Sequence, residues 1–189
     1  MTVVKNMPTF IDAHDMHVAK AVRDAQGVIS YSSGGLLGDL ISTSVTPDTR
    51  TFTHTSEHAG TRSSTRTYGG NISVVHEPIP FDRRSMLYGH EEGEDGELID
   101  NIADHTDGVG VAYYKEAMDD SFEGVFLPFV KFAEGTDEAN VALPDPSPTQ
   151  FTTTGVCEPD DKGNWRYRKR FESKEEAIAW IKIKLGITA

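Results

Sequence analysis

The architecture of this chain is set by residues 49–67, which read TRTFTHTSEHAGTRSSTRT. In the first seven positions threonine alternates with arginine, phenylalanine and histidine, and this period of two is typical of a β-strand. Residues 56–60 predict a turn, after which residues 61–67 return as a second polar strand. Neither strand has enough apolar side chains to cover a core on either face. We therefore predict a long β-hairpin arm, at about residues 46–68, that projects from the body of the protein.

The composition of this arm indicates how it behaves without a partner. A projecting hairpin with open edges can pair with another chain unless charges protect it. Arg62 and Arg66, together with the many Ser and Thr residues, would protect the edges in a free monomer. Because both faces are polar, burial offers little free energy to offset the entropy of ordering. We expect the arm to be mobile in a monomer and ordered in an assembly.

Strands are also predicted on the N-terminal side of the arm. Residues 16–22 and 27–31 read as two strands around the turn Asp24-Ala25-Gln26-Gly27. A third segment, residues 34–48, begins with a glycine pair and continues through apolar residues toward the arm. This side should therefore contribute strands to a core sheet.

A core strand and a short helix are predicted on the C-terminal side of the arm. The strand covers residues 72–75, and prolines end it. Residues 81–88 predict a helix, with Pro80 near its start and Gly89 suited to its C-terminal cap. The acidic stretch 90–108 has no clear periodicity and is predicted to be a loop.

Four further strands are predicted, at residues 109–117, 122–132, 149–158 and 163–171. Both faces of the second are apolar, which indicates burial on both sides. Pro128 within it predicts a bulge or an edge position, because proline lacks the N–H that a ladder needs. Residues 134–148 are rich in proline and acids and predict a loop.

The last predicted strand has one aromatic face and one basic face. Trp165, Tyr167 and Phe171 alternate with arginines, so the aromatic side chains should face the core. The opposite face should be an exposed basic stripe, formed by Arg166, Arg168 and Arg170.

The chain ends with its clearest helix, at about residues 173–185. Ser173 and Glu176 form a Ser-x-x-Glu capping box, and apolar residues follow at helical spacing. This helix should lie against the sheet and close the domain. The length suits one well-buried core, so we predict a single domain, residues 1–189, of the α+β class and mainly β.

Charge is unevenly distributed along the chain, whose formal net charge is −12. Residues 91–107 contain eight acids and no Lys or Arg, whereas the last 28 residues contain eight basic residues and three acids. A net acidic protein repels phosphate, so tight sequence-independent binding of DNA is not expected. The two oppositely charged segments could attract each other between neighbouring copies, or could be two solvated faces.

No arrangement of residues makes a case for catalysis or for a metal or cofactor. His14/His17 and His54/His58 have spacings that a metal could use, but neither pair has a third ligand at a recognisable interval. Cys157 lies in a predicted strand without a basic neighbour, so we expect a buried, inert thiol. We expect no catalytic residue, no cofactor and no metal site.

Signals for membrane insertion and secretion are also lacking. No apolar run approaches the roughly 18 residues of a membrane span, and the N-terminus lacks the apolar core of a secretory signal. The single cysteine excludes an internal disulfide, which fits folding in a reducing cytoplasm. We expect a soluble protein with no membrane partner.

The order and spacing of several motifs resemble the major tail tube proteins of long-tailed bacteriophages that infect Gram-positive hosts. The resemblance rests on Tyr68-Gly69-Gly70-Asn71-Ile72-Ser73-Val74, Met86-Leu87-Tyr88-Gly89, Gly108 to Tyr114, Gly124 to Phe132 and Pro148 to Gly155. It covers roughly residues 14–171, and the C-terminal helix is less familiar in this position.

This resemblance implies a β-sandwich or small barrel, flanked by a helix, that assembles into hexameric rings. The rings would stack into a hollow tube for genome ejection, with a tape-measure protein inside it and tail-tip and terminator proteins as further partners. DNA would be transiting cargo in a negatively charged bore, lined by acids from residues 91–107 or 134–145. The protein would reside in the virion, and in the host cytoplasm before assembly.

The arm fits the long arm by which members of this family contact neighbouring subunits. The residues expected at interfaces between copies are Arg50, Phe52, Arg62, Arg66, Tyr68, Arg166, Arg168 and Arg170. Another tail component is the alternative, either a tail terminator or a tube protein of a contractile injection system. An unrelated β-sandwich binding module or a metal-dependent enzyme is a third reading. A terminator or a ligand-binding sandwich has no need of a long polar arm.

Overall fold

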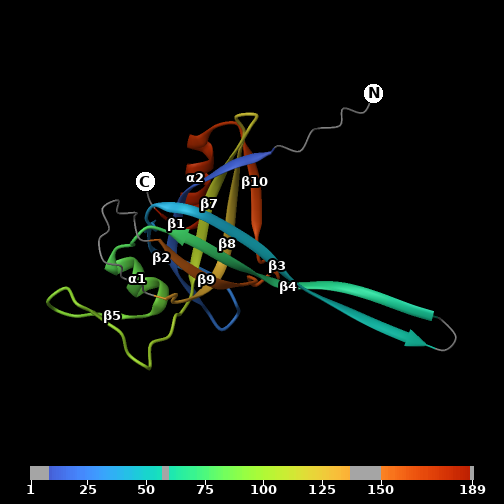
Figure 1. Ribbon diagram of the computed structural model, residues 1–189, viewed down its shortest axis with the longest axis horizontal. Coiled ribbons are helices and arrows are strands. Elements are labelled where there is room, and N and C mark those ends of the chain that lie inside the picture. The colour runs from blue at the N-terminus through green and yellow to red at the C-terminus, as the bar shows by residue number, and fades with distance from the viewer. Residues whose placement is uncertain (1–8, 57–59, 137–149, 188–189) are drawn as a thin grey trace, which may run out of the picture.

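The structure, a computed structural model, describes residues 9–56, 60–136 and 150–187. Its strands and helices are β1 (Phe10–Arg23), β2 (Ile29–Leu36), β3 (Leu40–Ser56), β4 (Gly60–His76), α1 (Phe81–Tyr88), β5 (Glu91–Glu92), β6 (Leu98–Ile99), β7 (Val109–Ala117), β8 (Phe122–Ala133), β9 (Phe151–Glu158), β10 (Tyr167–Phe171) and α2 (Lys174–Lys184). The predicted class, α+β and mainly β, is confirmed (Figure 1).

Eight of the described strands form one antiparallel sheet, in the order β2-β1-β7-β8-β9-β4-β3 with β10 attached to β8. One edge of β8 pairs with β7, and its other edge is shared by two strands. Residues 122–126 pair with β10, and residues 129–133 pair with β9. Pro128 lies between these two ladders, where a missing N–H costs no hydrogen bond. The register to β7 also shifts beside it, so the predicted bulge at Pro128 is confirmed.

The sheet buries both of its faces around β7 and β8. On one face, residues such as Ile72, Tyr113 and Leu127 form a first core, which Leu87 and Tyr88 of α1 also enter. On the other face, α2 forms a second core with the strands, whose members include Tyr114, Phe126, Ala177, Ile181 and Leu185. Because neighbouring residues of a strand point to opposite faces, Tyr113 and Tyr114 belong to different cores. The prediction that residues 122–132 are buried on both sides is therefore confirmed.

The two ends of the sheet remain apart in the described residues. No ladder joins the edge strand β2 to the edge strand β3. The chain passes between them through Leu37, whose N–H donates to the Met16 carbonyl at 2.8 Å. The sheet thus wraps around the first core, and no ladder among the described residues closes it. The β-sandwich or small barrel that the resemblance implies stays a prediction.

Both predicted helices are confirmed at their expected positions. The α1 helix ends at Gly89, which has a φ of 82° and donates its N–H to the Ser85 carbonyl. The α2 helix begins after Ser173, whose hydroxyl accepts a hydrogen bond from the Glu176 N–H at 3.3 Å. This bond, one of the two in the predicted capping box, starts the helix that covers the second core.

Several predicted boundaries were wrong. β1 begins at Phe10, before the predicted strand 16–22, and β2 continues to Leu36, past the predicted end at residue 31. The chain then turns at Gly38, which has a φ of 148°, before β3. The acidic stretch 90–108 is not wholly irregular, since β5 and β6 pair as a small hairpin. Most of the predicted loop 134–148 lies outside the described residues.

Another wrong boundary concerns the predicted strand 163–171, of which only Tyr167–Phe171 is strand. The Asp160 carboxylate accepts hydrogen bonds from the N–H groups of Lys162 and Asn164. This turn keeps residues 163–166 out of the β10–β8 ladder, which begins at Tyr167. Trp165 consequently packs against the first core, whereas Tyr167 and Phe171 belong to the second. The three aromatic residues do not share one face.

Candidate assembly surface

The arm is a two-stranded extension of the sheet, as Figure 1 shows on its right side. β4 pairs with β9 only over Gly70–His76, and from Asp48 and Gly69 outward β3 and β4 pair only with each other. Every described side chain from Thr49 to Thr55, and from Thr61 to Tyr68, is exposed. The predicted projecting arm is therefore confirmed as a structural element.

The register of the arm separates two chemically different faces. Directly opposite residues share a face, and the pairs on one face are Thr49 with Thr67, Thr51 with Thr65, Thr53 with Ser63, and Thr55 with Thr61. The hydroxyl oxygens are 3.0 Å apart in the second pair and 3.2 Å apart in the fourth. This hydroxyl face carries no charge.

The second face is basic and aromatic, and we call it the arginine face. Its cross-strand pairs are Arg50 with Arg66, Phe52 with Ser64, and His54 with Arg62. Tyr68 lies at the inner end of this face, where the Arg50 guanidinium is 5.2 Å from its ring centroid. Phe52 and Tyr68 expose about half of their surface, 53% and 47%. All five arm residues predicted at an interface thus lie on the arginine face.

The root of the arm requires two glycines. A Cβ on Gly69 would lie 2.4 Å from the Cys157 carbonyl oxygen, and one on Gly70 would lie 2.5 Å from the Trp165 ring. The ladder also has a bulge between Asp48 and Thr49. Larger residues at these positions would push β4 away from the body, so the glycines fix where the arm leaves the sheet.

The predicted basic stripe is only partly exposed. Arg168 and Arg170 lie on β10 and are exposed. Arg166 precedes the strand, is half-buried, and stacks its guanidinium 4.5 Å from the Trp165 ring centroid. Burial and the neighbouring Arg168 lower the pKa of Arg166 from its ordinary value. The structure thus brings Arg166 to the arm root, because Trp165 lies against Gly70.

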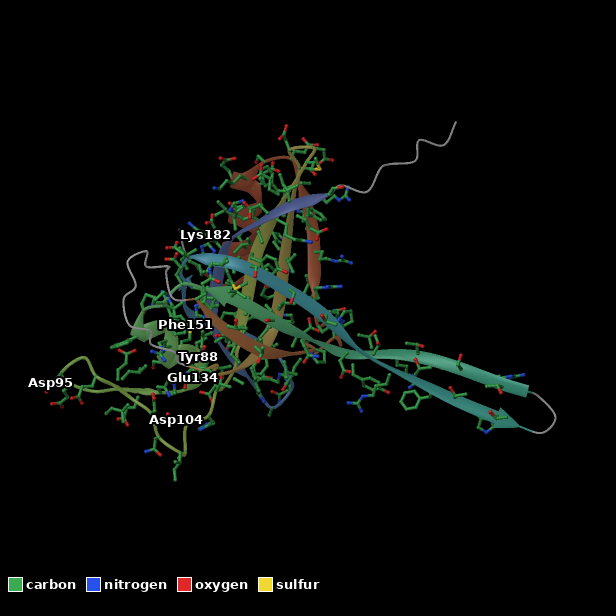
Figure 2. All side chains as sticks on the ribbon, viewed as in Figure 1. Tyr88, Asp95, Asp104, Glu134, Phe151 and Lys182 are labelled. Carbon is green, nitrogen blue, oxygen red and sulfur yellow. The ribbon has the colours of Figure 1, made fainter. Side chains whose placement is uncertain are left out.

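The acidic segment lies on the opposite side of the body from the arm, where Figure 2 labels Asp95. The hairpin of residues 91–99, here called the acidic hairpin, contains β5 and β6. Five exposed acids belong to it, namely Glu91, Glu92, Glu94, Asp95 and Glu97. None of the five forms an ion pair within the described ranges, so their charges face solvent.

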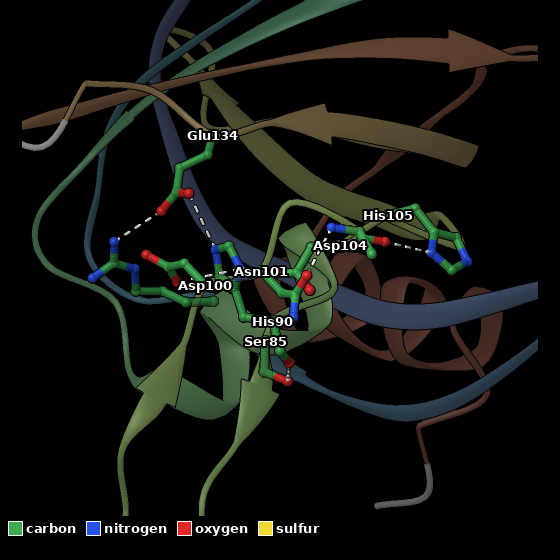
Figure 3. Close-up of polar contacts among 9 residues, drawn as sticks. Ser85, His90, Asp100, Asn101, Asp104, His105 and Glu134 are labelled. Carbon is green, nitrogen blue, oxygen red and sulfur yellow. Dashed lines mark hydrogen bonds and ion pairs between the residues drawn. The ribbon is translucent and has the colours of Figure 1, made fainter.

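A buried histidine, His90, holds the base of the acidic hairpin (Figure 3). Its side chain is 6% exposed, with Nδ1 2.8 Å from Asp104 Oδ2 and Nε2 3.1 Å from Glu134 Oε2. A third carboxylate, that of Asp100, lies 3.4 Å from Nδ1. Glu134 also binds Arg84 of α1, at 2.9 Å. This cluster joins the acidic hairpin to α1 and to the residue that follows β8.

Two opposing effects act on the pKa of His90. Burial alone would lower it, but the hydrogen bond to Asp104 and the charges of Glu134 and Asp100 outweigh burial and raise it. Sequence reasoning missed this residue. The signal that was present is an imidazole directly after a helix cap and at the start of an acidic run.

Replacing His90 with glutamine should remove a pH-dependent part of the stability. Because the pKa of His90 is higher in the folded than in the unfolded protein, protonation of His90 stabilises the fold. This contribution is complete below the unfolded pKa, about 6.5, and is lost as the pH rises through the pKa of the folded protein. The loss in His90→Gln should be about 1–3 kcal/mol at pH 6 and smaller at pH 8. Urea unfolding at both pH values measures it. His105→Gln, at a side chain that is 82% exposed, is the control and should change little. An unchanged pH slope in His90→Gln would contradict the assignment.

Three of the residues considered above as metal ligands or nucleophiles either form hydrogen bonds or ion pairs within the protein or are buried. His14 lies 3.2 Å from an Asp12 carboxylate oxygen, and His17 Nδ1 lies 2.8 Å from the Asp15 carbonyl. Cys157 is buried, and burial raises the pKa of its thiol to about 12. His58 lies outside the described residues. Among the described residues, no group of three or more His, Cys, Asp or Glu side chains is placed to hold a metal ion.

Two further observations concern the chain as a whole. Neither helix in the described ranges has the length and apolar character that crossing a membrane requires. Comparison of the sequence with models of known protein families, and with curated proteins, found no match.

Proposed function

We propose that this protein is the tail tube subunit of a long-tailed bacteriophage, a virion structural protein without enzymatic activity. Copies assemble into six-membered rings, and the rings stack into a tube around a tape-measure protein between the tail tip and the terminator. The single observation that carries this proposal is the arm. An isolated two-stranded hairpin is at best marginally stable in water, and this arm is exposed from Thr49 to Thr55 and from Thr61 to Tyr68. A partner that covers the arm would stabilise it, and many identical copies supply that partner.

The open edges of the sheet also support assembly from many copies. β3 is an edge strand of 17 residues, and β2 is the opposite edge strand. Unpaired edges invite pairing with another chain, and long ones are rarely left open in a monomer. Repeated contacts between copies would cover these edges as well as the arm.

A sheet face with a single charged side chain supports a conduit for DNA. Two rows of side chains cross β3, β4, β9 and β8 in register. The first row is Ser44, Ser73, Thr154 and Ala133, and the second row is Thr46, Asn71, Val156 and Lys131. Neither α1 nor α2 covers this face, because both helices bury their apolar residues in the two cores. A hydroxyl-rich wall with a single lysine offers phosphates few counter-charges.

Negative-stain electron microscopy of the concentrated, purified protein tests the proposal. Tubes, or rings with six-fold symmetry, are the expected result. Single rings that never stack would instead favour a tail terminator. A protein that stays monomeric at every concentration, and also with tail-tip components added, would overturn the proposal.

The purified protein should have no measurable affinity for duplex DNA at physiological salt. Each copy contributes a net charge of −12, so a ring is strongly negative and repels phosphate. Fluorescence anisotropy with a labelled duplex measures the affinity. Micromolar binding that weakens with added salt would contradict a passive conduit and would favour a role in packaging or replication.

A further inference from the structure

We propose that the arginine face of the arm docks on the acidic hairpin of the next copy, head to tail. The proposal rests on the self-assembly proposed above and names the two segments that carry it. The partner is a second copy of this chain, and the feature that the arm recognises is the acidic hairpin with its five exposed carboxylates.

Most arginines of the arginine face have no carboxylate partner among the described residues. Arg50 lies directly opposite Arg66, and like charges opposite each other destabilise a strand pair. Arg62 lies on the same face, opposite His54. Arg50 has Asp48 at 3.8 Å, whereas Arg62 and Arg66 form no ion pair in the part of the chain that the structure describes. Carboxylates placed over this face would relieve the repulsion, and the exposed Phe52 ring would gain cover.

The acidic hairpin is suited to supply these carboxylates. Its five acids project without ion-pair partners among the described residues, as described above. The buried His90, with Asp104 and Glu134, ties its base to α1 and β8. A hairpin whose base is fixed to the body loses less conformational entropy on binding than a mobile loop does. The acids are therefore both unpaired and preorganised.

The positions of the two segments determine the kind of assembly. The arm and the acidic hairpin project from opposite ends of the molecule (Figures 1 and 2), so they cannot meet within one chain. Two different complementary patches make a heterologous contact, which generates closed rings or open helical filaments. This docking also uses the acids of residues 91–97 between copies, and leaves them unavailable to the bore.

A second copy fits the arginine face better than a nucleic acid does. Arginine and aromatic side chains on a β-ribbon can contact phosphates and stack on bases. The net charge of −12 opposes that partner, because the field of the whole protein repels a polyanion. The acidic hairpin, by contrast, is present once for every arm.

Two charge-reversal variants test the docking. The arm variant carries Arg62→Glu and Arg66→Glu, and the hairpin variant carries Glu92→Lys and Glu94→Lys. Each alone should associate at least tenfold more weakly than the parent protein, because both partner surfaces then carry the same sign. An equimolar mixture of the two, and a protein with all four changes, should regain assembly. Sedimentation velocity and electron microscopy at physiological and at high salt measure the outcome.

Matched controls change the net charge equally at exposed or half-buried sites outside the arm and the acidic hairpin. Lys162→Glu with Lys182→Glu matches the arm variant, and Asp161→Lys with Glu172→Lys matches the hairpin variant. Both controls should assemble like the parent. Rescue in the mixture excludes misfolding, since an unfolded chain cannot co-assemble.

The outcomes separate this inference from the proposed function. If the parent forms tubes and both reversed variants do so equally well, the docking is wrong and the function stands. If no protein forms rings or tubes but the two variants associate specifically with each other, the docking stands and the function fails. If the parent binds duplex DNA and the arm variant loses that binding, the partner is nucleic acid and the docking is overturned.

Discussion

Deleting residues 49–67, with Asn-Gly in their place, is expected to leave a folded monomer that forms no tubes. Of the replaced residues that the structure describes, none contributes a side chain to either core. Asp48 and Gly69 face each other across the ladder, so the inserted Asn-Gly and the retained Tyr68 form a three-residue loop that can close the shortened hairpin. The stability should change by less than about 1 kcal/mol, which is typical of changes away from the core. Assembly should be lost completely, because the proposed contact between copies is removed.

Circular dichroism and urea unfolding check the fold of this deletion, and electron microscopy checks assembly. The parent protein at the same concentration is the reference. A second deletion that removes residues 54–62 retains Arg50 and Arg66, and should weaken assembly without abolishing it. Tubes of normal length from the full deletion would show that the arm is dispensable, and would remove the main support for the proposed function.

Replacing Ile181 with aspartate should have the largest effect on stability. Ile181 is fully buried in the second core, between α2 and the sheet. An unpaired carboxylate there loses the burial of the isoleucine side chain and its own hydration, at a cost of about 3–5 kcal/mol. At this chain length that cost lowers the melting temperature by roughly 6–20 °C.

The same helix offers a matched control for this substitution. Ile183 lies two residues further on and is 77% exposed. Ile183→Asp introduces the same chemistry into α2 without touching the core, so its melting temperature should stay within a few degrees of the parent value. Thermal unfolding followed by circular dichroism measures both variants. Equal effects at the two positions would mean that α2 does not close the second core.

The elements that the sequence predicted well are those that local chemistry determines. The alternation of threonine in residues 49–55 predicts strand and exposure together, because both follow from side-chain type and a period of two. Pro128 predicts a bulge because its missing N–H acts at its own position. Ser173 and Glu176 mark the start of α2, since the capping bond spans only three residues.

The remaining features depend on residues that are far apart in the chain. β9 and β10 share one edge of β8, and no local pattern reveals where the first ends and the second begins. The turn at Asp160 shortened the last strand, and this moved Trp165 to the other core. The His90 cluster joins side chains 14 and 44 positions from it, so its existence depends on the tertiary fold. The interface role of the eight predicted residues remains a prediction, because it depends on contacts between copies.

The β3–β4 ladder, with its bulge at the arm root, makes the mechanical response of the arm depend on the direction of the force. Its paired residues run without a change of partner from Leu40 and His76 in the body to Ser56 and Gly60 near the tip. The hydrogen bonds of an antiparallel pair lie perpendicular to the strands. A force that pulls one strand lengthwise past the other therefore loads many of these bonds at once, whereas a force that separates the strands at one end breaks them singly. An arm of this kind resists tension along its length and bends easily across it, and a tube joined by such arms could flex without coming apart.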